Sequence, residues 1–178
     1  MPGDLKTREK IGIEAAMKAG KVLVENFDKN HKISTKPDGT LVTDVDLRAE
    51  KEIMETIKAK FPEDEILSEE NVYPVKGARY RWIIDPLDGT HNYIRGVNIA
   101  GTSIALEFNK EIVAGIIHMP FTKELYFASK GGGSYLNDRR IYVSKKNLKH
   151  STRIYDSNII NEQTEVMIEH LKKLKNKV

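Results

Sequence analysis

The sequence contains no cysteine among its 178 residues. Disulfide bonds, thiolate metal sites and a cysteine nucleophile are therefore excluded. It also lacks a run of about 18 apolar residues, the length needed to cross a bilayer, and its N-terminus lacks the apolar core of a signal peptide. These absences predict a cytoplasmic protein that has no membrane partner.

The chain also has little excess of charge of either sign. Lys and Arg number 29 and Asp and Glu 26, for a formal charge of +3. Nucleic-acid-binding proteins usually gather a larger basic excess on one face, so we expect no nucleic-acid partner. The hydrophobic fraction of 39% and charged fraction of 31% are typical of a globular domain, and the length suits one domain with a real core.

Two helices are predicted in the first third of the chain. Small and apolar residues recur every four positions between Leu5 and Phe27, which is one face of an amphipathic helix. A second ladder with the same spacing consists of Val45, Ala49, Ile53, Ile57 and Phe61. Thr43 stands before this ladder with Asp46 three residues on, a variant of the capping box, and Pro62 is expected to end the helix.

Beyond Pro62, short apolar runs separated by turn residues predict strands. The expected strands are Glu65–Ser68, Tyr80–Ile84, Gly101–Phe108, Ile112–His118, Leu125–Ala128, Gly133–Leu136, Ile141–Val143 and Arg153–Tyr155. The turns between them are expected at Asn109-Lys110, Gly131–Gly133 and Asn137-Asp138, and a last helix at Glu162–Lys175. This order predicts a layered α+β fold with two N-terminal helices packed on a mostly antiparallel sheet.

Acidic side chains gather at three boundaries between the predicted elements. Asp44 and Asp46 begin the second helix, Glu69 and Glu70 follow one strand, and Asp85 and Asp88 follow the buried strand that ends at Ile84. Hard cations such as magnesium take oxygen ligands. Singly, each group has a simpler interpretation as a helix cap, a turn residue or solvated surface, but their joint arrangement favours a metal site.

The segment Asp85–Thr90 carries most of this prediction. Pro86 restricts the backbone of the expected turn, and aspartates three residues apart can bind adjacent ions together with the Leu87 carbonyl. Gly89 and Thr90 are expected to begin a short helix, whose free amides suit a phosphate oxygen.

Three motifs in this sequence resemble those of the inositol monophosphatase family of lithium-sensitive, metal-dependent phosphatases. They are Leu41–Asp46, Ser68–Glu70 and Trp82–Thr90, in the family's order and at its intervals. The resemblance runs from about Leu5 to about Ser157. It implies a sugar-phosphatase-like fold, magnesium as cofactor, hydrolysis of a small phosphorylated metabolite by metal-activated water, and a possible homodimer.

The resemblance also implies roles for individual residues. Glu69, Asp85, Asp88 and the carbonyl of Leu87 would hold metal, and Asp46 with the Thr90 hydroxyl would activate water. Asp88, Gly89 and Thr90 would bind the substrate phosphate. Glu70 would lie behind the metal ligands and Lys36 near the site, whereas Asp44 receives no role.

One motif of the family has no counterpart here. Family members are longer, and a Trp-Asp motif in their second half completes the second metal site, whereas Trp82 is the only tryptophan in this chain. We therefore expect residues 1–157 to form an N-terminal metal- and phosphate-binding domain, and 158–178 to form a helix that starts a largely missing second domain. Two alternatives stay open: a non-catalytic fragment or split subunit, and, within the same chemistry, action on fructose 1,6-bisphosphate or 3′-phosphoadenosine 5′-phosphate.

Overall fold

The structure is a computed structural model that describes residues 4–37 and 39–146. The chain divides into two compact units, 1–141 and 142–178, and the fold below is that of the first. The strand expected at Arg153–Tyr155, the helix expected at Glu162–Lys175 and the domain boundary after residue 157 lie outside the described residues. Within the described part, no helix is long and apolar enough to span a membrane.

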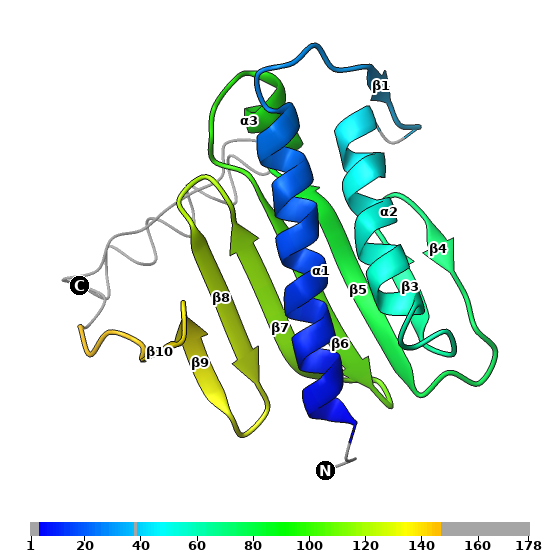
Figure 1. Cartoon of the computed structure of the whole chain (residues 1–178), viewed down its shortest axis with the longest axis vertical. Coiled ribbons are helices and arrows are strands. Elements are labelled where there is room, and N and C mark those ends of the chain that lie inside the picture. Colours follow the sequence, from blue (N-terminus) through cyan, green and yellow to red (C-terminus); the bar gives the residue numbers. More distant parts are fainter. Residues whose placement is uncertain (1–3, 38, 147–178) are drawn as a thin grey trace, which may run out of the picture. The chain divides into compact units, whose positions relative to one another are not determined.

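A mixed eight-stranded sheet forms the base of the first unit (Figure 1). Its spatial order is β10-β9-β8-β7-β6-β5-β3-β4, and every neighbouring pair is antiparallel except β3 and β5. The strands are β3 (Glu65–Ser68), β4 (Val72–Tyr73), β5 (Tyr80–Asp88), β6 (Gly101–Phe108), β7 (Glu111–Met119), β8 (Glu124–Ser129), β9 (Gly133–Leu136) and β10 (Arg139–Ile141). A separate hairpin pairs β1 (Ile33–Thr35) with β2 (Leu41–Thr43).

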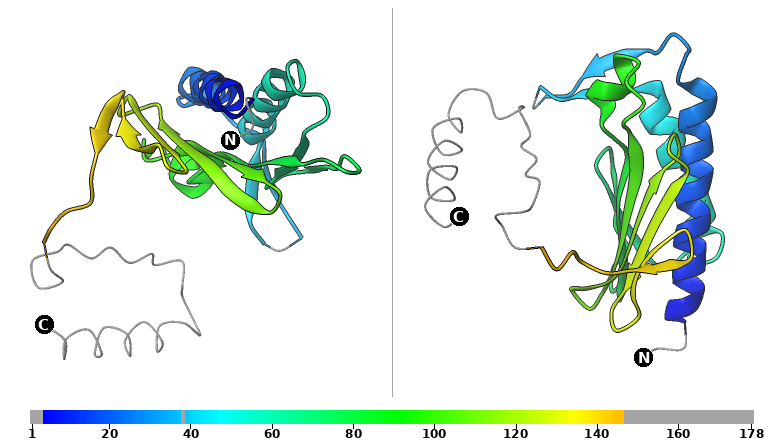
Figure 2. Two further views of the ribbon diagram at one scale, coloured as in Figure 1. Left: turned by 90° about the horizontal axis from the view of Figure 1, so that it is seen from below. Right: turned by 90° about the vertical axis from the view of Figure 1, so that its left-hand side faces the viewer.

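Two long helices cover one face of this sheet (Figure 2). Helix α1 (Leu5–Asn26) packs on β6 and β7, and α2 (Asp44–Lys58) packs on β5 and against α1. A short third helix, α3 (Thr90–Ile94), follows β5. The predicted α+β class, with two N-terminal helices on a mostly antiparallel sheet, is confirmed.

The four-residue ladders of both helices face the sheet and build the core. Ala15, Ala19 and Leu23 of α1 are fully buried, and so are Val45, Ala49, Ile53 and Ile57 of α2. Small residues let α1 approach closely: a Cβ on Gly12 would lie 2.6 Å from Cδ1 of Ile116 and 2.9 Å from Cζ3 of Trp82. The sheet contributes Trp82, Ile84, Ile104, Leu106 and Ile116.

A buried ion pair fixes the first turn of α1 to the sheet. The Arg8 guanidinium donates two hydrogen bonds of 2.8 Å to the carboxylate of Asp64, which also accepts one of 2.9 Å from Trp82 Nε1. The same guanidinium lies between the rings of Phe61 and Tyr80, 3.9 and 3.8 Å from their centroids. Each charge therefore has the partners that burial demands.

The hydrophobic pattern missed three short strands and misplaced the last described strand, β10. β1, β2 and β4 were not predicted, because each has only two or three residues. β10 begins directly after the Asn137-Asp138 turn and ends at Ile141, so the expected strand Ile141–Val143 is wrong in position.

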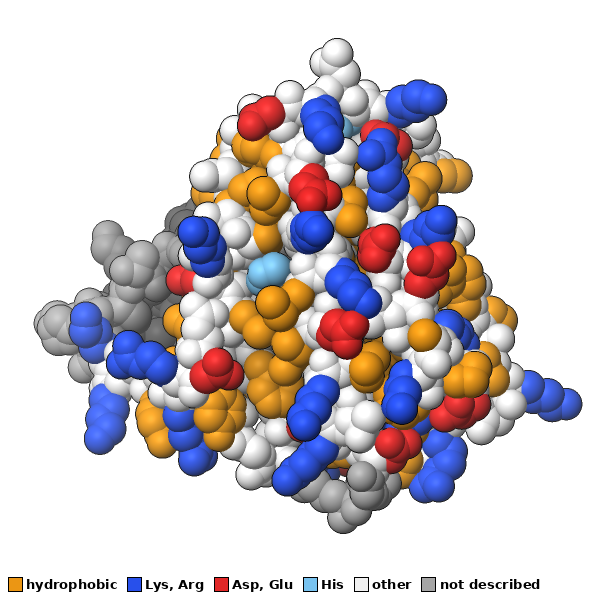
Figure 3. All heavy atoms as spheres, viewed as in Figure 1, with side chains coloured by type: hydrophobic (Ala, Val, Ile, Leu, Met, Phe, Trp, Pro, Cys, Tyr) orange, Lys and Arg blue, Asp and Glu red, His pale blue; other side chains and the backbone are white. Residues whose placement is uncertain are grey.

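On the face that carries α1 and α2, basic and acidic side chains lie intermixed, in keeping with the small net charge (Figure 3).

Candidate functional site

Asp46 is held rigidly at the first turn of α2. Thr43 caps the helix by accepting hydrogen bonds from the amides of Val45 and Asp46, and in return the Thr43 amide donates to Asp46 Oδ2 at 2.9 Å. The Thr43 hydroxyl donates to the same oxygen at 2.5 Å. The predicted capping box is therefore confirmed, and it fixes a side chain that is only 2% exposed.

The Thr90 hydroxyl joins Asp46 to the end of β5. It lies 3.2 Å from Asp46 Oδ1 and 3.0 Å from the carbonyl oxygen of Leu87. A hydroxyl has one proton, so it donates to one of these acceptors at a time and keeps its lone pairs available to a donor. Asp46 thus meets Leu87 and Thr90, which are more than forty residues away in sequence, in one polar cluster.

The Asp85–Asp88 segment is not the turn that the sequence predicted. It continues β5, with Asp85 opposite Ser103 and Asp88 opposite Gly101, so that two residues of β5 face one of β6. This is a β-bulge, stabilised where the buried Thr102 hydroxyl donates to the Pro86 carbonyl at 3.0 Å. The bulge breaks the strict alternation that would send residues three apart to opposite faces of the sheet.

The short helix expected at Gly89 and Thr90 is confirmed as α3. Gly89 precedes it with φ of 87°, and a Cβ there would lie 2.9 Å from the carbonyl oxygen of Ile99. Only glycine fits both the left-handed backbone and the close approach. The Gly89 carbonyl accepts from the Tyr93 amide at 3.0 Å, so the helix turns directly after the bulge.

Glu69 and Asp85 emerge at the same end of the sheet, because β3 and β5 run parallel with Ser68 opposite Ile84. The Glu69 amide also donates to the Ile84 carbonyl at 2.9 Å. Lys36, in the connection between β1 and β2, forms ion pairs with Glu69 at 2.9 Å and Glu70 at 2.8 Å. The β1–β2 hairpin is thereby tied to the turn after β3.

Burial and mutual repulsion raise the pKa values of the clustered acids. Burial, together with the negative charges of Glu69 and Asp88, raises the pKa of Asp85 to about 7. Burial also raises the pKa of Asp46 against the hydrogen bonds of Thr43 and Thr90, and that of Glu70 against the Lys36 ammonium. Carboxylates that raise one another's pKa in this way form a place where a cation would be strongly stabilised.

The donor set fits a hard divalent cation. Asp85 Oδ1 is buried and has no hydrogen-bond partner among the described residues, and the neighbouring Glu69 carboxyl, Asp88 carboxyl and Leu87 carbonyl are all oxygen donors. Across residues 4–37 and 39–146, however, no three acidic or histidine side chains lie close enough together to hold a metal ion. Lys36 forms an ion pair with Glu69, whose side chain is 44% exposed.

The structure thus brings the predicted residues to one end of the sheet. The Thr90 hydroxyl contacts both Asp46 and the Leu87 carbonyl. The negative charges of Glu69 and Asp88 raise the pKa of Asp85. Gly89 links this group to α3. Asp44, which received no predicted role, pairs with Arg48 and accepts from the Lys32 amide.

Two supporting side chains were missed by the sequence reasoning. Thr102 supports the bulge from β6, and no local pattern marks it. Glu50 is buried one turn after Asp46 on α2. Its spacing from Asp46 could have identified it, because residues four apart lie on the same face of a helix.

The chain belongs to the inositol monophosphatase family, which it matches over residues 4–178. The fructose-1,6-bisphosphatase/inositol-1-monophosphatase of Aquifex aeolicus is 39% identical over 155 residues, 85% of this chain and 59% of that protein. The histidinol-phosphatase of Chlorobaculum parvum is 40% identical over 135 residues, 75% of this chain and 52% of that protein.

Solved structures agree with this assignment. The crystal structure of the extragenic suppressor protein suhB from Bartonella henselae aligns with a TM-score of 0.74 and 38% identity, over 77% of this chain and 54% of that one. The chain spans between 52% and 59% of the length of the curated and solved relatives named here.

Proposed function

We propose that this chain carries the water-activating and phosphate-binding residues of a magnesium-dependent phosphomonoesterase. The observation that carries the proposal is the contact of the Thr90 hydroxyl with Asp46 and with the Leu87 carbonyl, beside the buried, unpartnered oxygen of Asp85. A proton acceptor and the oxygen donors proposed for the cation would thus lie next to each other.

Asp46 and Thr90 would move the proton of the attacking water. With the Thr90 hydroxyl donating to Asp46 Oδ1, an oxygen lone pair of Thr90 is left to accept a hydrogen bond from water. Thr43 keeps the Asp46 carboxylate from rotating, and burial raises its pKa, which makes it a stronger base than an exposed aspartate.

Glu69, Asp85, Asp88 and the Leu87 carbonyl would hold the magnesium. When bound, the metal lowers the pKa of a ligated water and neutralises phosphate charge. The backbone amides of Gly89 and Thr90 would receive a phosphate oxygen. Asp88 would serve phosphate binding by holding this cation, because its own carboxylate repels the ester.

The relatives' names support a substrate class, and both this class and the individual substrate are proposals. A small phosphorylated metabolite fits relatives named for inositol monophosphate, fructose 1,6-bisphosphate and histidinol phosphate. The expected homodimer and the expected lack of a nucleic-acid partner remain predictions.

The experiment measures phosphate release from these three compounds and from 3′-phosphoadenosine 5′-phosphate, with and without magnesium. We compare the wild-type chain, Asp85→Asn, and Asp138→Asn as a matched control at an exposed turn position whose positive φ suits asparagine. Release that depends on magnesium and is lost only in Asp85→Asn supports the proposal, and equal release by all three chains refutes this metal site.

The alternative of a non-catalytic metal-binding chain is separated by calorimetry with magnesium. Two binding sites together with turnover exclude it. A single site without turnover on any of the four compounds favours it, and the missing donors must then come from elsewhere.

A further inference from the structure

Glu50 is a buried acid of α2 that the mechanism above does not use. It lies one helical turn after Asp46 and is 4% exposed. Its Oε2 accepts hydrogen bonds from Asn71 Nδ2 at 2.8 Å and from the Tyr73 hydroxyl at 3.4 Å, while Oε1 is buried and has no partner among the described residues. Burying a carboxylate is costly, so this position has a reason beyond packing.

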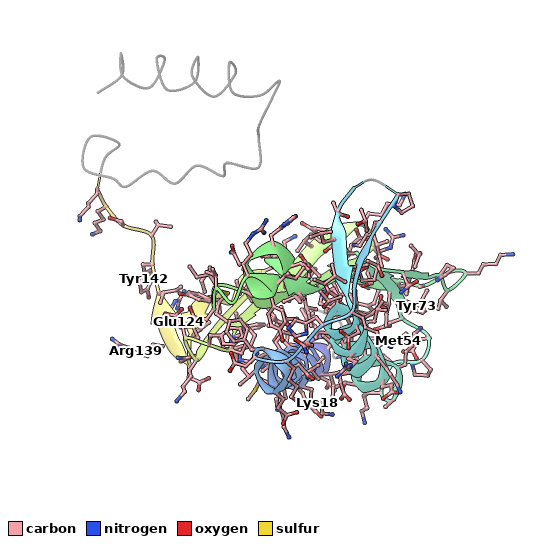
Figure 4. The ribbon with its side chains drawn as sticks, turned by 90° about the horizontal axis from the view of Figure 1, so that it is seen from above. Lys18, Met54, Tyr73, Glu124, Arg139 and Tyr142 are labelled. Carbon is pink, nitrogen blue, oxygen red and sulfur yellow. The ribbon has the colours of Figure 1, made fainter. Side chains whose placement is uncertain are left out.

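The partners of Glu50 belong to the turn that presents Glu69 and Glu70. The Asn71 carbonyl accepts from the Ser68 amide at 2.8 Å, which closes the turn with the two glutamates at its tip. The Glu70 amide donates to Ser68 Oγ at 3.3 Å inside the turn. Tyr73 follows on β4 and lies at the same edge of the molecule as Met54 of α2 (Figure 4).

We propose that Glu50 is a positioning residue that holds the Ser68–Asn71 turn against α2, and so sets where Glu69 stands relative to Asp85. The same helix then fixes both halves of the site, Asp46 directly and Glu69 through Asn71. The link to metal binding rests on the proposed function, in which Glu69 is a ligand. The proposed effect of Glu50 on the order of the turn does not depend on that function.

The hydrogen bonds of Glu50 distinguish a positioning role from simple filling of space in the core. Asn71 is exposed and adds nothing to the hydrophobic core, so its hydrogen bond to Glu50 is not a packing contact, whereas the half-buried Tyr73 also packs against the core. A leucine at position 50 would fill the same volume but release both donors. A glutamine would keep one oxygen that accepts from both, as Glu50 Oε2 does now.

Hydrogen exchange on the metal-free chain tests the ordering of the turn. We compare Glu50→Leu, Glu50→Gln and Asn71→Ala with Glu55→Gln, a control on the exposed face of the same helix. In Glu50→Leu and Asn71→Ala, the amides of Ser68 and Glu70 are expected to exchange about tenfold faster, as fits the loss of one or two hydrogen bonds. Glu50→Gln and Glu55→Gln should stay within about threefold of the wild type.

Binding of Mn²⁺, followed by its electron paramagnetic resonance, tests the link to the site. The dissociation constant should rise about tenfold in Glu50→Leu and Asn71→Ala and recover in Glu50→Gln, since a mobile ligand must be ordered on binding. The proposal is overturned by unchanged exchange at the turn in a folded Glu50→Leu chain, or by a loosened turn with unchanged Mn²⁺ affinity.

Two further experimental outcomes also have a defined interpretation. If Glu50→Leu does not fold, Asn71→Ala decides, because it changes only an exposed side chain. A wild-type chain that binds no Mn²⁺ overturns the proposed function, and the exchange rates then decide alone whether Glu50 orders the turn.

Discussion

Replacing Asp85 by asparagine is expected to remove a pH-dependent weakness of the metal-free fold. The folded-state pKa of Asp85 is raised from 3.8 to about 7 by burial and by the charges of Glu69 and Asp88. Between those values the folded chain holds a proton that the unfolded chain has lost. Stability therefore falls as pH rises from about 4 to about 7, the reverse of the usual aspartate.

The size of the effect follows from the same shift. Each pKa unit corresponds to about 1.4 kcal/mol. Between pH 5 and pH 8, the folded chain holds the extra proton over roughly two pH units, from pH 5 to the folded-state pKa. The free energy of unfolding therefore falls by ~2.7 kcal/mol without solvent screening. Because the Asp85 side chain is only partly buried, we reduce this to about 1–2 kcal/mol.

Urea unfolding in the presence of a chelator measures this difference. Wild type should lose about 1–2 kcal/mol more than Asp85→Asn between pH 5 and pH 8, with equal denaturant slopes. Magnesium at pH 8 should then stabilise wild type and leave Asp85→Asn unchanged, since a ligand stabilises only the state that binds it. Parallel pH profiles for the two chains would show that Asp85 does not carry the repulsion described above.

Three further substitutions have defined outcomes. Arg8→Met should lower the free energy of unfolding by about 3–5 kcal/mol, because it leaves the Asp64 carboxylate buried without its cation; an unchanged melting temperature would contradict this. Gly89→Ala should cost about 1–3 kcal/mol through its positive φ and the contact with the Ile99 carbonyl, whereas Gly77→Ala, with a similar φ but open space, should cost less in the same denaturant assay. Thr90→Ala should lower kcat by roughly 10²–10⁴-fold with little change in the unfolding midpoint, and full activity would remove Thr90 from the proton path.

Regular periodicity made the helices and hairpins predictable. The α2 ladder predicts its buried face, and Thr43 with Asp46 marks its start, because a capping box is formed by residues only three apart. The hairpin between β6 and β7 turns at Asn109-Lys110 as expected, and both residues have positive φ there. These features depend on neighbours in sequence.

The features that the sequence did not reveal depend on distant partners. Pro86 reads locally as a turn, yet Thr102 draws the segment into β5 as a bulge. The parallel pairing of β3 with β5 and the double ion pair of Lys36 likewise join segments that no short window contains. The acidic residues could be found from the sequence because they follow predicted strands. The directions in which their side chains point depend on tertiary contacts, which the sequence does not show.

The extra residue in β5 has a consequence for how this region can change in length. Within Asp85–Asp88, deleting one residue would restore regular pairing with β6 and remove the local bend and added twist that a bulge gives its strand, and with them the present directions of these side chains and carbonyls. The connection between α3 and β6 has no such register to keep. Homologous chains should therefore vary in length after Ile94 but conserve the spacing from Ile84 to Thr90, so that the site diverges there by substitution alone.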